Sequence, residues 1–87
     1  MAPALQVVGK VLDARGQPVA GARLLWQRAP VALPDTATLS QADGGFVLAV
    51  PVAGRYTLQC VSDRHGETRV DLDIGPGGST VTLQLPR

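Results

Sequence analysis

The chain has 87 residues, of which 45% are hydrophobic and 17% charged, a balance typical of one small globular domain and unlike that of a disordered segment. Its 8 Lys and Arg residues are nearly matched by 7 Asp and Glu residues, so little positive charge is left to bind phosphates, and we expect no nucleic-acid partner. Apolar runs such as Phe46 to Ala53 are too short to cross a bilayer, and the N-terminus shows no signal-peptide pattern. We therefore expect no membrane insertion.

Turn residues divide the chain into short segments. Clusters of Gly and Pro recur roughly every eight to twelve residues, and the runs between them alternate apolar and polar side chains or carry β-branched residues, which is typical of an all-β sandwich or barrel. The first run predicts a strand over 5–12, and the Asp, Gly and Pro residues of 13–18 predict the turn that ends it. A second strand is predicted over 22–28.

The middle of the chain predicts a connection, a strand and a turn. Pro30 and Pro34 cannot donate hydrogen bonds to a ladder, so 29–35 is expected to connect two strands. The strand pattern resumes over 36–41. The run Asp43-Gly44-Gly45 then predicts a tight hairpin turn, because glycine accepts the positive φ that such turns require.

Four further strands are predicted, over 46–50, 55–62, 67–74 and 80–85. Apolar and polar residues alternate along most of these segments, so one face of each strand is expected to be buried and the other to meet water. The total of about seven strands predicts a two-sheet Greek-key sandwich.

The same alternation assigns individual side chains to the interior. It places Phe46 and Tyr56 in the core, with Cys60 as a small buried hydrophobe and not a reactive thiol. Gly9 is expected to let a large side chain or the facing sheet approach closely. Two interpretations stay open for Trp26. The alternation along its strand points the side chain inward, as for a core anchor, whereas its place near a strand end would let it cap a binding surface.

Four segments carry a resemblance to a known family: Val7-Val8-Gly9-Lys10-Val11-Leu12-Asp13, Gly16-Gln17-Pro18-Val19-Ala20-Gly21-Ala22, Ser40-Gln41-Ala42-Asp43-Gly44-Gly45-Phe46 and Gly54-Arg55-Tyr56-Thr57-Leu58. In this order they resemble the carboxypeptidase regulatory-like domains, which have a transthyretin-like (prealbumin-like) β-sandwich, over essentially the whole chain. The resemblance implies that 1–87 form one domain, an accessory module of a larger bacterial protein. It also implies an extracytoplasmic or surface-associated setting, where such modules stabilise or dock a neighbour.

Enzymes of similar fold need residues that this chain lacks. Val11-Leu12-Asp13 and the turn from Gly16 to Gly21 resemble the hydroxyisourate hydrolases. However, Lys10 stands where that family carries a histidine, and with 1 His in the whole chain the required imidazole pair cannot be assembled. We therefore expect no enzyme, with a transthyretin-related hydrolase as a distant alternative.

Covalent and metal chemistry is disfavoured for similar reasons. Lys10 has no Asn partner for an internal isopeptide bond anywhere in the chain. The metal site of the intradiol dioxygenases needs more ligands than Tyr56 and His65, and Asp43 has no second acid in its loop to bind calcium. We interpret His65 as a solvated residue of a polar turn, and we expect no cofactor and no metal.

The predicted outward faces carry more apolar residues than a free monomer normally displays together. They include Leu39 and Ala49. The residues that we predict to bind a partner are Val8, Leu12, Leu25, Val47 and Val61 on the outward faces, and Val31 and Leu33 in the connection that Pro30 and Pro34 hold open.

The sequence thus favours a structural or protein-docking module that binds a neighbouring domain or another subunit. A carbohydrate-binding module is the alternative, because the sandwich architecture permits it. Sugar sites usually present aromatic platforms, and aromatic residues make up only 3% of this chain. That proportion favours a protein partner.

Overall fold

The computed structural model describes residues 5–33 and 37–87, which form seven strands. In chain order these are β1 (Leu5–Leu12), β2 (Arg23–Arg28), β3 (Thr38–Leu39), β4 (Gly45–Val50), β5 (Gly54–Ser62), β6 (Gly66–Ile74) and β7 (Ser79–Gln84). Across the described residues, no helix is long and apolar enough to cross a membrane. The predicted all-β class is confirmed.

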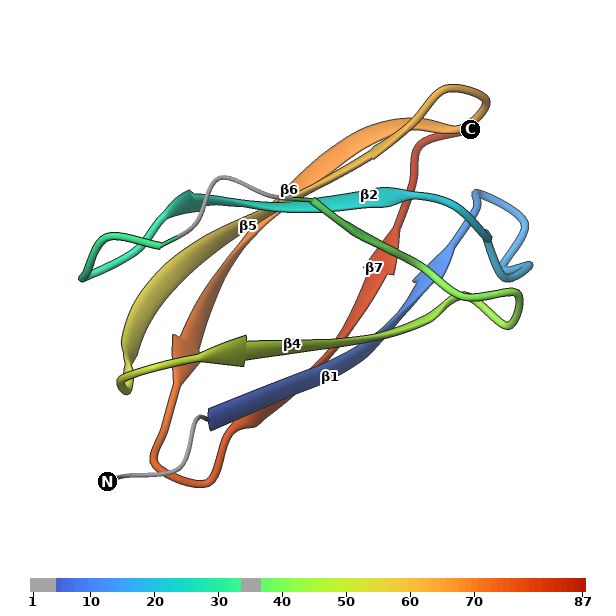
Figure 1. Ribbon diagram of the computed structural model, residues 1–87. Coiled ribbons are helices and arrows are strands. Elements are labelled where there is room, and N and C mark those ends of the chain that lie inside the picture. Colours follow the sequence, from blue (N-terminus) through green and yellow to red (C-terminus); the bar gives the residue numbers. More distant parts are fainter. Residues whose placement is uncertain (1–4, 34–36) are drawn as a thin grey trace.

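The strands form two sheets, which pack as the layers of a sandwich (Figure 1). One sheet has three strands in the order β4-β1-β7, with β1 antiparallel to β4 and parallel to β7. The other has four strands in the order β3-β2-β5-β6, and all its neighbours are antiparallel. The chain changes sheet after β1, β3, β4 and β6, so that the core lies between the layers. The predicted two-sheet sandwich is confirmed.

The third strand is much shorter than the predicted 36–41, of which residue 36 lies outside the described residues. Only Thr38–Leu39 pairs as a strand. Ser40 leaves the ladder because its hydroxyl oxygen accepts a hydrogen bond from the Ala22 amide at 2.9 Å and its own amide donates to the Ala22 carbonyl. Ser40 is therefore held by the turn that precedes β2.

The predicted hairpin at Asp43-Gly44-Gly45 is wrong in its connectivity. The tight turn does form, with φ of 78° at Gly44 and a 2.8 Å hydrogen bond from its amide to the Gln41 carbonyl. However, β3 and β4 belong to different sheets, so this turn carries the chain across the sandwich. The Gly44 carbonyl accepts a hydrogen bond from the Val11 amide, which continues the pairing of β4 with β1.

The core is built from the inward residues of both sheets. The fully or nearly fully buried apolar side chains are Val7, Val11, Val19, Ala22, Leu24, Phe46, Leu48, Val50, Tyr56, Leu58, Cys60, Ile74, Leu83 and Leu85. Gly9 is the register partner of Phe46, and a Cβ atom built on Gly9 would lie 2.5 Å from Cζ of the Phe46 ring. The predicted close approach at Gly9 is therefore confirmed, and the Phe46 ring occupies the space that a side chain would need.

We predict that Gly9→Ala lowers the free energy of unfolding by about 1–3 kcal/mol, because the new methyl group overpacks a filled core. The matched control is Gly75→Ala, since a Cβ at Gly75 would meet no atom within 4 Å. The control should change stability by less than about 0.5 kcal/mol. Urea unfolding of both variants measures the difference, and equal losses would contradict the packing of Phe46 over Gly9.

Candidate functional site

The two outer faces of the sandwich differ in charge. On the four-stranded sheet, charged side chains cover β5 and β6 and form cross-strand pairs. Arg55 lies 3.9 Å from Asp73, the Thr57 hydroxyl donates to Asp71 at 2.7 Å, and the Gln59 amide donates to Glu67 at 3.1 Å. Several polar side chains of this face thus contact one another across the strands.

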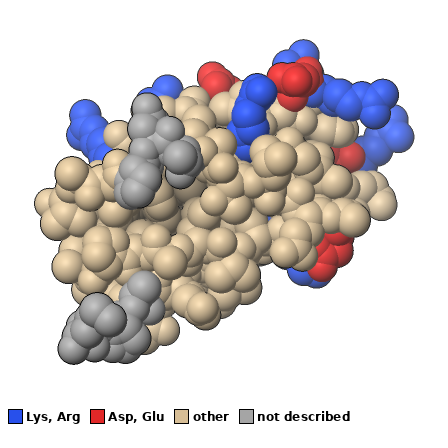
Figure 2. Space-filling view, viewed as in Figure 1, with Lys and Arg blue, Asp and Glu red and all other residues tan. Residues whose placement is uncertain are grey.

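The outer face of the three-stranded sheet is nearly free of charge. Its outward residues are Gln6, Val8 and Lys10 of β1, Val47 and Ala49 of β4, and Thr80, Thr82 and Gln84 of β7. Lys10 is the one charged side chain in this set. Figure 2 views the sandwich from the side, as Figure 1 does: blue and red atoms lie mainly along the upper and right margins, and most of the remaining surface in this view is uncharged.

Val8 and Val47 form the apolar centre of this neutral face. They are register partners on adjacent strands and are 43% and 52% exposed, respectively. Thr80 pairs with Val8 on its other side. Neighbouring side chains of β1, β4 and β7 therefore form one row across the whole sheet, at Val47, Val8 and Thr80.

The sandwich separates the residues that the sequence predicted as one binding set. Val8 and Val47 lie together on the three-stranded sheet, whereas Leu25 and Val61 lie on the opposite outer face, where both are half-buried. There Val61 pairs with Arg23, and Leu25 pairs with Gln59, across the ladder between β2 and β5.

The remaining predicted residues lie away from both of these pairs. Leu12 is half-buried at the end of β1, and Val31 is 40% exposed in the connection between β2 and β3. Leu33 packs against the core from the same connection. Among the other apolar residues predicted to point outward, Leu39 is 60% exposed and Ala49 is exposed.

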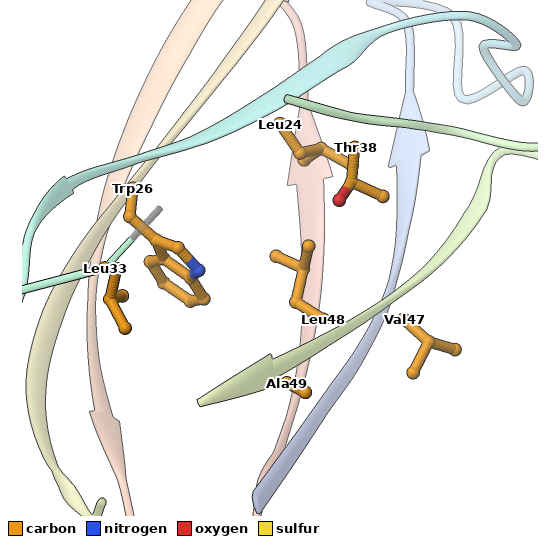
Figure 3. Close-up of a pocket in the computed structure, with 7 residues that line it drawn as sticks. All are labelled: Leu24, Trp26, Leu33, Thr38, Val47, Leu48 and Ala49. Atoms are coloured by element: carbon orange, nitrogen blue, oxygen red, sulfur yellow. The ribbon is translucent and has the colours of Figure 1, made fainter. Parts of the chain in front are cut away.

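A hollow of about 180 Å³ opens between the two sheets beside β4. Leu24 and Trp26 of β2 form one wall, Leu48 with its neighbours Val47 and Ala49 forms the other, and Leu33 and Thr38 complete the lining (Figure 3). We call this hollow the Trp26 slot. The sequence analysis did not predict it, and the one signal that bore on it was the ambiguity of Trp26.

Trp26 combines the two roles that its sequence position left open. Its ring packs against the core and lies 5.1 Å from the Tyr56 ring at an interplanar angle of 55°. The Trp26 side chain is only half-buried, because its other face lines the slot. Trp26 is therefore both a core residue and a wall of the slot.

Cys60 and His65 are the described side chains most suited to reactive chemistry. Burial raises the pKa of the Cys60 thiol to about 11, so the thiol stays protonated at neutral pH. His65 lies half-buried in its polar turn, and its Nδ1 donates to the Arg87 carbonyl at 2.8 Å. Within 5–33 and 37–87, no three His, Cys, Asp or Glu side chains cluster closely enough to hold a metal ion.

A comparison of the sequence with family models agrees with the all-β sandwich. The model described as the carboxypeptidase regulatory-like domain matches residues 6–86. The chain belongs to this family. This match confirms the resemblance drawn from the four sequence segments. Domains of this family are small non-catalytic β-sandwich modules. A search of the curated proteins for relatives of this sequence finds no match.

We predict that the Cys60 thiol of the folded regulatory-like domain is nearly inert. With a pKa of about 11, roughly one thiol in a thousand is ionised at pH 8, and the sulfur is fully buried as well. A disulfide reagent such as dithiobisnitrobenzoate should therefore react at least about a hundredfold more slowly with the native chain than with the chain in guanidinium. Equal rates in the two states would contradict the burial of Cys60.

Proposed function

We propose that this domain is a non-catalytic protein-docking module of a larger bacterial protein and that it contacts its partner through the outer face of the three-stranded sheet. The observation that carries this proposal is the difference in charge between the two outer faces. A partner that covers charged groups must strip them of water, which costs free energy unless every charge finds a new counterpart. The neutral row of Val47, Val8 and Thr80 carries no such cost.

The size of the apolar centre is suited to a docking contact. Full burial of one valine side chain contributes about 1.5 kcal/mol or somewhat more, and the exposed fractions of Val8 and Val47 leave about half of that contribution available to a partner. The surrounding Thr and Gln side chains supply hydrogen-bonding groups, as the rim of a protein interface does. A neutral rim with a small apolar centre favours specific contact without driving aggregation.

The aromatic residues do not favour a sugar ligand. Phe46 and Tyr56 are buried, and Trp26 lies in the slot between the sheets, with its ring tilted against Tyr56. A sugar platform needs an aromatic ring that lies flat and open on the surface. The protein partner is therefore the better supported proposal.

A pair of cross-linking variants tests the proposed docking face. The photoreactive residue p-benzoylphenylalanine replaces either Thr80, on the neutral face, or Arg69, on the charged face, in the chain produced in the organism that encodes it. We expect one defined protein partner to be cross-linked from position 80 and none from position 69. Cross-links from position 69 alone would assign docking to the other sheet, and no protein cross-link from either would contradict a docking role.

A charge at the centre of the docking face should weaken this contact. In the cross-linking chain, Val8→Asp should reduce the cross-linked yield about tenfold or more, because apolar burial is lost and a carboxylate must be desolvated. Leu25→Asp is the matched control, since Leu25 points outward from the opposite sheet. Circular dichroism checks that both variants remain folded. A loss with Leu25→Asp but not with Val8→Asp would overturn the choice of face.

A further inference from the structure

β4 leaves one edge of the three-stranded sheet open. It is the terminal strand of the order β4-β1-β7, and within 5–33 and 37–87 its only ladder joins it to β1. The Val11 amide donates to the Gly44 carbonyl at 2.8 Å. Because the backbone groups of successive residues alternate in direction along an antiparallel strand, those of Phe46 and Leu48 also face β1. The amides and carbonyls of Val47 and Ala49 therefore point away from the sheet.

Two other edges of the sandwich carry features that discourage strand pairing. The edge strand β6 alternates with Glu67, Arg69, Asp71 and Asp73, and charged residues on an edge oppose the addition of another strand. The edge strand β3 is only two residues long. The remaining edges, β4 and β7, have neither protection, because neither Gly45–Val50 nor Ser79–Gln84 contains a charged residue or a proline. Of these two strands, β4 is the one that lines the Trp26 slot.

The Trp26 slot lies on the inner side of this open edge. Figure 3 shows the Leu48 side chain directed between the sheets from β4, with Trp26 and Leu33 facing it across the slot. A strand added beside β4 would direct every second side chain to the same inner side as Leu48, since paired residues share a face. The slot of about 180 Å³ has room for one such side chain, because an engineered apolar cavity of about 150 Å³ accepts a benzene molecule.

We propose that β4 binds an extended segment of the partner as an added strand, with an aliphatic or aromatic side chain of that segment, level with Leu48, in the Trp26 slot. This inference rests on the proposed docking function and names the kind of partner. Main-chain hydrogen bonds to Val47 and Ala49 supply affinity, and the slot selects the side chain, as in other cases of recognition by β-strand addition. The outward side chains of the same segment would lie beside Val47 on the docking face.

A second copy of this chain does not fit the slot. Its own β4 could pair with the open edge, but its inward residues Phe46 and Leu48 are buried in its own core, 2% and 7% exposed. They have no side chain to give to the slot of another molecule. The occupant is therefore a single extended segment whose inward side chain is still free.

Hydrogen exchange of the free domain gives the first test. In a dilute sample, the amides of Val47 and Ala49 should exchange at least about a hundredfold faster than those of Phe46 and Leu48, which bond to β1. Slow exchange at all four positions would show that the edge is covered in the free chain, and it would overturn the proposal. Protection that appears only at high protein concentration would assign the edge to a second copy and would also overturn it.

Peptide titration by NMR gives the second test. The probe is the acetylated and amidated peptide Lys-Ser-Thr-Leu-Thr-Ser-Lys, whose central Leu would enter the slot, and the control has Asp at that position. We expect saturable shifts of the Val47 and Ala49 amides and of the Trp26 indole, with the Asp peptide at least about tenfold weaker. An absence of saturable shifts at these amides, or equal binding of the two peptides, would overturn the proposal.

Two variants separate the backbone contacts from the side-chain contact. Ala49→Pro removes the outward amide without removing a hydrogen bond to β1, and it should weaken the Leu peptide at least about tenfold, whereas Ala49→Thr, which keeps the amide, should not. Thr38→Phe fills the slot and should abolish the preference for Leu over Asp. Should Ala49→Pro fail to fold, Thr38→Phe still decides, because a preserved preference would overturn the role of the slot.

The outcomes distinguish this proposal from the docking function on which it rests. Cross-linking from position 80 that is lost in Val8→Asp, with no peptide bound at β4, would leave the docking function standing and remove strand addition. Peptide binding at β4 without any protein cross-link would remove docking through the neutral face and would leave the edge site. Absence of both would remove both.

Discussion

The packing of Phe46 over Gly9 is the contact on which the three-stranded sheet depends. The two residues are register partners on β4 and β1, and the ring lies so close that any side chain at position 9 would displace it. The contact fixes which residues of β4 point inward. Val47 and Ala49 must then point outward, with their backbone groups at the free edge of the sheet. The outward side chains of β4 and the direction of its outer backbone groups therefore follow from one packing contact in the core.

Space remains between β4 and the four-stranded sheet on the same side of the sandwich. Leu33 and Thr38 line it, whereas Ser40, at the other end of the short β3, is held by the turn before β2. Trp26 fills part of this space by resting on Tyr56, and the remainder is the slot. β4 thus borders the slot and carries one of the exposed valines beside Val8, while cross-strand polar pairs such as Arg55–Asp73 lie on the opposite sheet.

Much of the fold could be predicted from local patterns, because a strand with one buried face must alternate with period two. The segment over 5–12 is a strand with the predicted bounds, and the burial of Phe46 and Cys60 follows from the same alternation. The alternation says which residues point outward but not from which sheet. Val8 and Leu25 therefore looked alike in the sequence, although they lie on opposite faces. The slot depends on how Trp26 and Leu48 face each other from different sheets, which the local alternation does not show.

A structure of the domain in complex with its cross-linked partner would decide which face docks. We expect partner atoms to contact Val8 and Val47 and an extended partner segment to run beside β4, while Arg69 on the opposite sheet stays in solvent. A partner seated over β5 and β6, with Val8 and Val47 exposed as in the free chain, would contradict this expectation.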